Sequence, residues 1–170
     1  MDLSARTLLK GPIPFLIIGV VALLAFNFGL IGPPAPPADS DYNWTEVTVT
    51  DESGQQLGVV TARIADTPAK RYTGLSNTTS MPADEGMLFT YDSEGEHTFV
   101  MRDMDFPLDI IFVDANGTIT KIYHAPVPPE GTNNSDLTRY PGTGQYILEV
   151  NRGWTTDHGV SVGDTVTVSE

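Results

Sequence analysis

The stretch that most constrains the fold is residues 97–114, HTFVMRDMDFPLDIIFVD, in which two apolar segments flank a polar bend. Residues 97–101 and 108–113 have the length and the content of Ile, Phe and Val that are typical of β-strands rather than helices. Pro107 cannot donate a hydrogen bond to a sheet, and it restricts Phe106 to an extended conformation. We therefore expect a polar elbow, residues 101–105, between two buried strands, and we expect the site of this protein there.

Short strands are also expected elsewhere in the chain. Val47 and Val49 alternate with threonines, and residues 57–64 alternate again. The pair Asn116-Gly117 lies between two apolar runs, so residues 108–114 and 118–124 should form an antiparallel hairpin. Further strands are predicted at residues 87–91, 145–150 and 165–169.

Two short helices and two irregular segments complete this interpretation. Thr67-Pro68 predicts a capped helix over residues 68–75, and residues 151–158 form a second short helix that ends at Gly159. Residues 92–96 are expected to be an acidic turn and residues 125–144 a long loop. Because no βαβ rhythm is present, the expected fold is mainly β (α+β), a small antiparallel barrel or rolled sheet.

One N-terminal transmembrane helix is expected to precede this fold. Residues 13–31 are 19 nearly uninterrupted apolar residues, enough to cross a hydrocarbon core of about 30 Å. Arg6 and Lys10 precede them, so the rule that positive residues stay inside predicts a cytoplasmic tail (1–12) and an extracellular domain (44–170). Residues 32–43 form a proline-rich linker. The competing interpretation is a cleaved signal peptide, although no clear cleavage site follows.

The chain is acidic, with a formal net charge of −13, and it has only three lysines. An acidic surface repels nucleic acid and anionic headgroups, so nucleic acid is not expected as a partner. The composition resembles that of proteins from salt-loving archaea, and an ordinary acidic exported protein is the alternative. The absence of cysteine excludes disulfides, thiol catalysis and thiolate metal sites.

Six motifs that follow one another in the chain resemble those of the Domain of Unknown Function 192 family. They are Thr73-Gly74-Leu75, Gly86-Met87-Leu88-Phe89, Phe99-Val100-Met101-Arg102, residues 107–114 (PLDIIFVD), Tyr146-Ile147-Leu148-Glu149 and Val162-Gly163-Asp164. The resemblance implies a small β-rich domain, which often follows an export signal. It does not imply any particular reaction. This chain has Val100 where the family usually has an aromatic residue, and Asp103-Met104 where the family usually has Asn-Thr.

Four N-glycosylation sequons lie on the side that is predicted to face outward, at Asn43, Asn77, Asn116 and Asn133. Each falls in a predicted loop or turn, where a glycan fits. Asn116 is the weakest of the four because the hairpin turn needs it. Chance occurrence in a threonine-rich chain is the alternative.

The elbow carries the residues from which a site could be built. Met101, Arg102 and Asp103 are the first candidates for ligand binding, with Arg102 as a clamp for an anionic or hydroxyl-bearing ligand and Asp103 fixing it. Asp105 and Asp109 are added because paired carboxylates can bind a hard cation or divide into acid and base for glycoside hydrolysis. In this binding interpretation Asp109 supports the elbow from beneath. The structural alternative is that Asp103 pairs with Arg102 or a backbone N–H, while Asp109 and Asp114 end strands as turn caps.

His97 and His124 are not spaced as in a known metal or hydrolase motif. With Met81, Met87, Met101 and Met104 they would suit a copper(I) site, although such methionines usually fill a core. No cofactor is therefore expected. The function predicted from the sequence is a membrane-anchored, extracellular binding or interaction module for a small molecule, a glycan or a cell-surface protein. A cell-surface hydrolase that uses Asp103, Asp105 and Asp109 is the first alternative, and a metal-binding module is the second.

Overall fold

The structure is a computed structural model that describes residues 42–169. The predicted cytoplasmic tail, the predicted transmembrane anchor and the predicted linker up to residue 41 lie outside the described residues. Within residues 42–169 no helix has the length and apolar character needed to span a membrane.

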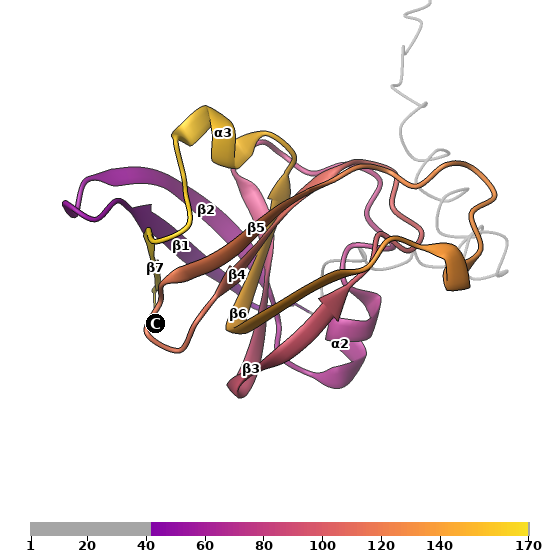
Figure 1. Ribbon diagram of the computed structural model, residues 1–170, viewed down its shortest axis with the longest axis horizontal. Coiled ribbons are helices and arrows are strands. Elements are labelled where there is room, and N and C mark those ends of the chain that lie inside the picture. Colours follow the sequence, from indigo (N-terminus) through magenta and orange to yellow (C-terminus); the bar gives the residue numbers. More distant parts are fainter. Residues whose placement is uncertain (1–41, 170) are drawn as a thin grey trace, which may run out of the picture. The chain divides into compact units, whose positions relative to one another are not determined.

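The described residues form seven strands and three short helical segments (Figure 1). In chain order these are β1 (Trp44–Thr50), β2 (Gln56–Ala65), α2 (Pro68–Thr73), β3 (Glu85–Phe99), β4 (Leu108–Val113), β5 (Ile119–Ala125), the 3₁₀ helix η1 (Asn134–Asp136), β6 (Tyr140–Asn151), α3 (Trp154–His158) and β7 (Thr165–Val168).

All seven strands belong to one sheet, in the order β5-β4-β6-β3-β2-β1-β7. The sheet curls into a half-barrel, because its two ends approach each other where Thr118 pairs with Thr165. The amide of Ile119 donates to the carbonyl of Asp164 at 2.9 Å beside this bridge. The fold is therefore mainly β, with a rolled sheet as expected.

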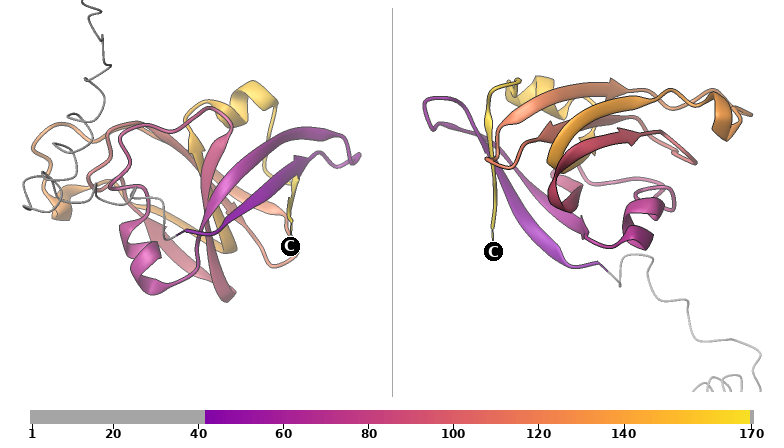
Figure 2. Two further views of the ribbon diagram at one scale, coloured as in Figure 1. Left: turned by 180° about the vertical axis from the view of Figure 1, so that it is seen from behind. Right: turned by 60° about the horizontal axis from the view of Figure 1, so that its bottom comes forward.

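Side chains alternate between the two faces of the sheet, so each face has its own core. Val47, Leu88, Ile111 and Leu148 belong to one buried cluster, which Trp154 of α3 also joins. The neighbouring residues in the same strands belong to a second cluster, which includes Phe89, Ile110, Phe112 and Ile147 together with Leu75, Met101 and Met104. Figures 1 and 2 show α3 and α2 on opposite sides of the sheet.

Local sequence signals for the hairpin and the helices are confirmed. β4 and β5 pair antiparallel, and the carboxylate of Asp114 accepts the amides of Asn116 and Thr118 at 2.8 Å in the turn between them. Thr67 caps α2 by accepting the amide of Lys70 at 3.3 Å. α3 ends at Gly159, whose φ of 70° suits glycine.

Three expectations were wrong. β2 and β3 pair in parallel, because the segment between them, which contains α2, is long enough to carry the chain back across the sheet. Residues 92–96 are part of β3, whose register against β6 shifts between Thr90 and Gly95, so the acidic run is a bulge rather than a turn. β6 begins at Tyr140, earlier than expected. Its first residues pair only with β3, where Pro141 lies opposite Thr98, and β4 pairs with β6 only from Tyr146 onward. Proline is tolerated there because this part of β6 has no β4 partner that needs its N–H group.

Candidate functional site

The elbow lies between the end of β3 and the start of β4, and its side chains do not share one environment. Met101 is buried and belongs to the second core cluster. Arg102 is partly buried, whereas Asp103 and Asp105 are exposed. Asp103 has a φ of 54°, a left-handed conformation that aspartate tolerates better than most residues. The turn at Asp103 thus directs Met101 inward and leaves both carboxylates in solvent.

Arg102 fastens the elbow to α2 and the segment that follows it. Its guanidinium lies 4.1 Å from the centre of the Tyr72 ring, and its Nη2 donates to the carbonyl of Tyr72. The hydroxyl of Ser76 donates to the carbonyl of Arg102 at 2.9 Å. Asp103 lies 3.8 Å from Nε of Arg102, a contact between partly exposed groups that contributes little.

Asp109, which was included among the predicted ligand-binding residues, is an internal residue whose contacts are all with the protein. It has no exposed surface. Its Oδ1 lies 2.6 Å from Nδ1 of His124, and its Oδ2 accepts the Thr155 hydroxyl at 2.6 Å, the Thr155 amide at 3.0 Å and the Gly153 amide at 3.1 Å. The structure therefore does not bring Asp103, Asp105 and Asp109 together.

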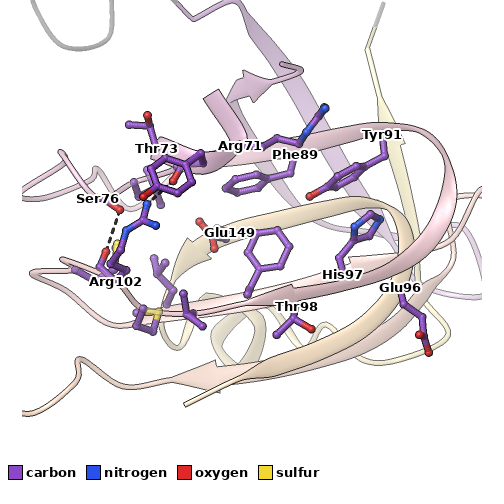
Figure 3. Close-up of a pocket in the computed structure, with 18 residues that line it drawn as sticks. Arg71, Thr73, Ser76, Phe89, Tyr91, Glu96, His97, Thr98, Arg102 and Glu149 are labelled. Atoms are coloured by element: carbon purple, nitrogen blue, oxygen red, sulfur yellow. Dashed lines mark hydrogen bonds between the residues drawn. The ribbon is translucent and has the colours of Figure 1, made fainter. Parts of the chain in front are cut away.

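A pocket opens beside the elbow, with a volume of about 360 Å³. We call it the elbow pocket. Its walls come from α2 and the turn after it, from β3 and from the elbow, and its lining residues are 71–76, 89, 91, 96–102, 104, 108 and 149 (Figure 3). Met101 and Arg102 of the predicted site line it, and Asp103 does not.

Glu149 of β6 is the buried acid that lines this pocket, whereas Glu96, which also lines it, is exposed. Glu149 is 5% exposed, its oxygens open onto the pocket, and no described residue forms a hydrogen bond or an ion pair with its carboxyl. The flanking strand positions are Met87 of β3 and Ile110 of β4, both fully buried. Burial raises the pKa of Glu149 from about 4.5 to about 8, since the charged form loses its hydration. Figure 3 shows the carboxyl directed into the space bounded by Arg102, Phe89 and His97.

The opposite end of the elbow pocket is an aromatic pair with an arginine beside it. The rings of Tyr91 and His97 stack with their centres 3.6 Å apart, and the Arg71 guanidinium lies 4.7 Å from the centre of the Tyr91 ring. Burial lowers the pKa of His97, and its buried Nε2 has no hydrogen-bond partner. Burial also raises the pKa of Tyr91. Arg71 is held in place because its Nη1 donates to the carbonyls of Asp66 and Thr90 at 2.8 and 2.7 Å.

The structure offers no obvious metal centre within residues 42–169, where no three His, Asp or Glu side chains are grouped closely enough to hold an ion. His97 lines the elbow pocket, whereas His124 bonds Asp109. Met81, Met87, Met101 and Met104 are buried in the second core cluster.

All four predicted glycosylation sites lie at exposed positions. Asn43 precedes β1, Asn77 follows α2, Asn116 lies in the β4–β5 turn and Asn133 precedes η1. Asn133 also donates to Asp136 at 3.4 Å. Their modification stays a prediction.

Three residues that line the pocket were not predicted from the sequence as site residues: Glu149, Arg71 and Tyr91. The signal for Glu149 was present in the motif Tyr146-Ile147-Leu148-Glu149. A strand that alternates faces places Glu149 on the same side as Ile147, which predicts an acid on an apolar face. Arg71 and Tyr91 had no such signal, because their contact joins α2 to β3 and depends on the tertiary arrangement of these elements.

Comparisons with known proteins agree on the fold. Residues 48–168 match the model of the Domain of Unknown Function 192 family, described as "Uncharacterized ACR". A protein of unknown function from Novosphingobium aromaticivorans is 33% identical, with a TM-score of 0.67, over 81% of this chain and 93% of that one. A candidate transcription regulator from Sinorhizobium meliloti is 29% identical, with a TM-score of 0.67, over 75% of this chain and 95% of that one. A search of curated proteins found no match.

Proposed function

The chain belongs to the Domain of Unknown Function 192 family, and on this premise we propose that residues 44–170 form a membrane-anchored, outward-facing module that binds a small molecule in the elbow pocket. The observation that carries the proposal is Glu149, a buried acid without a partner that is directed into the pocket. Buried polar groups in folded proteins are nearly always hydrogen-bonded, and exceptions call for an explanation. A ligand that enters the pocket would supply the missing partner.

The pocket has the size of a small-molecule site, and its lining mixes polar with apolar side chains. Its volume of about 360 Å³ lies at the lower end of the range for ligand pockets. Phe89 and Phe99 supply apolar wall, and Glu149 and Arg102 supply polar groups. Arg102 also ties together two walls of the pocket, which keeps its shape defined in the absence of ligand.

Binding has more support than hydrolysis. Of the predicted catalytic carboxylates, Asp109 has only internal contacts, and Asp103 and Asp105 are exposed and do not line the pocket. A second carboxylate close to Glu149 would contribute to the rise in its pKa, and burial is the only cause of that rise. A glycosidase needs two carboxyl groups across one cleft. Glu149 therefore serves better as the anchor of a binding site.

The membrane anchor and the outward orientation rest on the sequence, on residues 13–31 and the positive residues before them. Nucleic-acid binding, which the description of the Sinorhizobium meliloti protein would suggest, is not proposed for this chain. Its net charge of −13 opposes the approach of a phosphate backbone.

A pair of matched variants of the full-length chain tests the pocket. Phe99→Trp adds bulk to a residue that lines the pocket, and Phe106→Trp makes the same change at a partly buried residue outside that lining. A small-molecule library is screened by thermal shift in detergent. We expect stabilising compounds whose effect is lost in Phe99→Trp and kept in Phe106→Trp. Compounds that stabilise both variants equally would overturn the pocket proposal.

Mass spectrometry of the chain extracted from its native membrane tests the remaining parts. We expect an intact N-terminus that includes residues 13–31, glycan on Asn43, Asn77 or Asn133, and a small molecule that co-purifies. Protease added to intact cells should degrade residues 44–170. A chain that begins after residue 31 would contradict the membrane anchor. A domain that the protease does not degrade would contradict the outward orientation.

A further inference from the structure

The partner that Glu149 lacks can be assigned a chemical class. We propose that the ligand of the elbow pocket is a small organic ammonium ion, whose nitrogen pairs with the Glu149 carboxylate while its apolar body lies against Phe89 and Phe99. This inference rests on the proposed binding function and makes it specific.

The first step of the argument is that the pocket's own cations do not neutralise Glu149. Arg71 is occupied by two backbone carbonyls and the Tyr91 ring, and Arg102 by the carbonyl and ring of Tyr72. Neither arginine is among the causes of the shift in the pKa of Glu149. The carboxyl is thus left for a group that comes from outside.

The second step concerns the aromatic surface. Tyr72 and Tyr91 already carry a guanidinium over their rings. Phe89 and Phe99 meet edge to face, with their centres 4.9 Å apart, and no lysine or arginine of the described residues lies over either ring. Aromatic rings beside a carboxylate form the usual environment for ammonium ligands, because the ring face is negative. Phe99, which is partly exposed, and one buried acid remain available for such a ligand, and Phe89, which is 2% exposed, completes the apolar wall.

The third step excludes the other charge classes. The groups around Glu149 in the pocket that carry or can carry charge are Arg71, Arg102, His97, Glu96, Tyr72 and Tyr91. Both arginines lie at the ends of the pocket, and His97 stays neutral because burial lowers its pKa. An anion would find both arginines already bonded to backbone carbonyls, and above pH 8 it would also meet the Glu149 carboxylate. A neutral alcohol would gain one hydrogen bond but no charge pairing.

Binding of the cation is coupled to a proton. Burial raises the pKa of Glu149 to about 8, so the empty pocket holds a neutral carboxylic acid at pH 7. When the ammonium ion enters, the carboxyl O–H bond breaks, its proton leaves to solvent, and a carboxylate–ammonium pair forms with no other change. Below pH 8 the affinity should therefore fall about tenfold for each unit by which the pH is lowered. It should level off above pH 8 until the amine itself loses its proton.

Calorimetry on the full-length chain tests this with three probes that share one body, 2-phenylethylamine, 2-phenylethanol and phenylacetate. We expect the amine to bind at least tenfold more tightly than the other two. Titrations in buffers of different ionisation enthalpy should show about one proton released at pH 7. Glu149→Gln should abolish the preference for the amine, whereas Glu46→Gln, an exposed acid on β1 far from the pocket lining, should keep it.

Three results would each overturn the ammonium assignment: equal or weaker binding of the amine, binding without proton release, or unchanged amine affinity in Glu149→Gln. Circular dichroism of Glu149→Gln separates loss of binding from loss of fold, and glutamine matches the size of the protonated acid. The screen with Phe99→Trp judges the pocket independently, so the ligand class can fail while the binding function stands.

Discussion

The hydroxyl of Thr155 in α3 donates a 2.6 Å hydrogen bond to Oδ2 of Asp109, a residue of β4 that lies 46 positions earlier in the chain. The same oxygen accepts the amides of Thr155 and Gly153, so one carboxylate binds an amide of the first turn of the helix and the amide of the residue before it. Asp109 therefore fixes α3 against the sheet. The contact explains why an acid sits within the otherwise apolar strand LDIIFV.

Removal of the Asp109 carboxylate should destabilise the domain. Asp109→Ala leaves the donors of Thr155 and Gly153 unpaired in the interior, and we expect the free energy of unfolding to fall by about 3 kcal/mol. Asp109→Asn keeps one acceptor oxygen, so it should cost less. The exposed Asp105→Ala is the control and should change the free energy by no more than about 0.5 kcal/mol. Urea unfolding measures all three, and equal stability of Asp109→Ala and Asp105→Ala would refute the structural role.

Glu149 should make the stability depend on pH. Its pKa is raised to about 8 in the folded domain and stays near 4.5 in the unfolded chain. Between these values the unfolded chain has released the proton and the folded domain has kept it, so stability is lost as the pH rises from about 5 to 8. The loss approaches about 1.4 kcal/mol per pH unit. Above pH 8 both states are ionised, and the dependence ends.

The measurement for Glu149 is the difference in unfolding free energy between Glu149→Gln and the unmodified chain, taken from pH 5 to 9. His97, whose pKa burial lowers, is present in both proteins and cancels in the difference. We expect the glutamine variant to gain relative stability steadily up to pH 8. A difference that does not vary with pH would show that Glu149 ionises normally in the folded domain.

The parts of the fold that the sequence predicts are those with a local cause. The hairpin follows from Asn116-Gly117 and the helix starts and stops from Thr67 and Gly159, because a turn or a cap needs only neighbouring residues. The parallel pairing of β2 with β3 has no local cause, since two strands separated by a crossover carry no signal of their relative direction. The run of motifs that resembles the family did indicate the fold, and that resemblance is confirmed.

The prediction of the site was limited in the same way, to features with a local cause in the sequence. The elbow was recognised because its polarity is contiguous in sequence, and Met101 and Arg102 do line the pocket. Glu149 lies about 45 residues later, and only the β3–β6 and β4–β6 pairings bring it beneath the elbow. The sequence left the role of Asp109 open, because a charged residue in an apolar strand gives the same pattern whether its partner is a ligand or the start of a helix.

Gly142 of β6 should tolerate no side chain. A Cβ there would lie 2.6 Å from the Phe112 ring, and Phe112 is fully buried and cannot move aside. Gly142→Ala should lower the free energy of unfolding by about 1–3 kcal/mol. Gly95→Ala is the control, because its nearest neighbour would be the His97 ring at an ordinary 3.7 Å. Thermal unfolding compares the two, and similar midpoints would show that the ring does not pack on Gly142.

Arg102 should stabilise α2 through the shape of its side chain as well as its charge. The guanidinium lies over the Tyr72 ring and donates to the Tyr72 carbonyl, and a lysine ammonium lacks the delocalised group that favours such a contact. Both Arg102→Ala and Arg102→Lys should therefore speed hydrogen exchange at the α2 amides of Arg71 and Gly74 by about fivefold. Arg139→Ala, at an exposed position before β6, should leave these amides unchanged. If Arg102→Lys exchanges like the unmodified chain, charge alone holds the elbow to α2, and the pocket wall depends on electrostatics rather than on stacking.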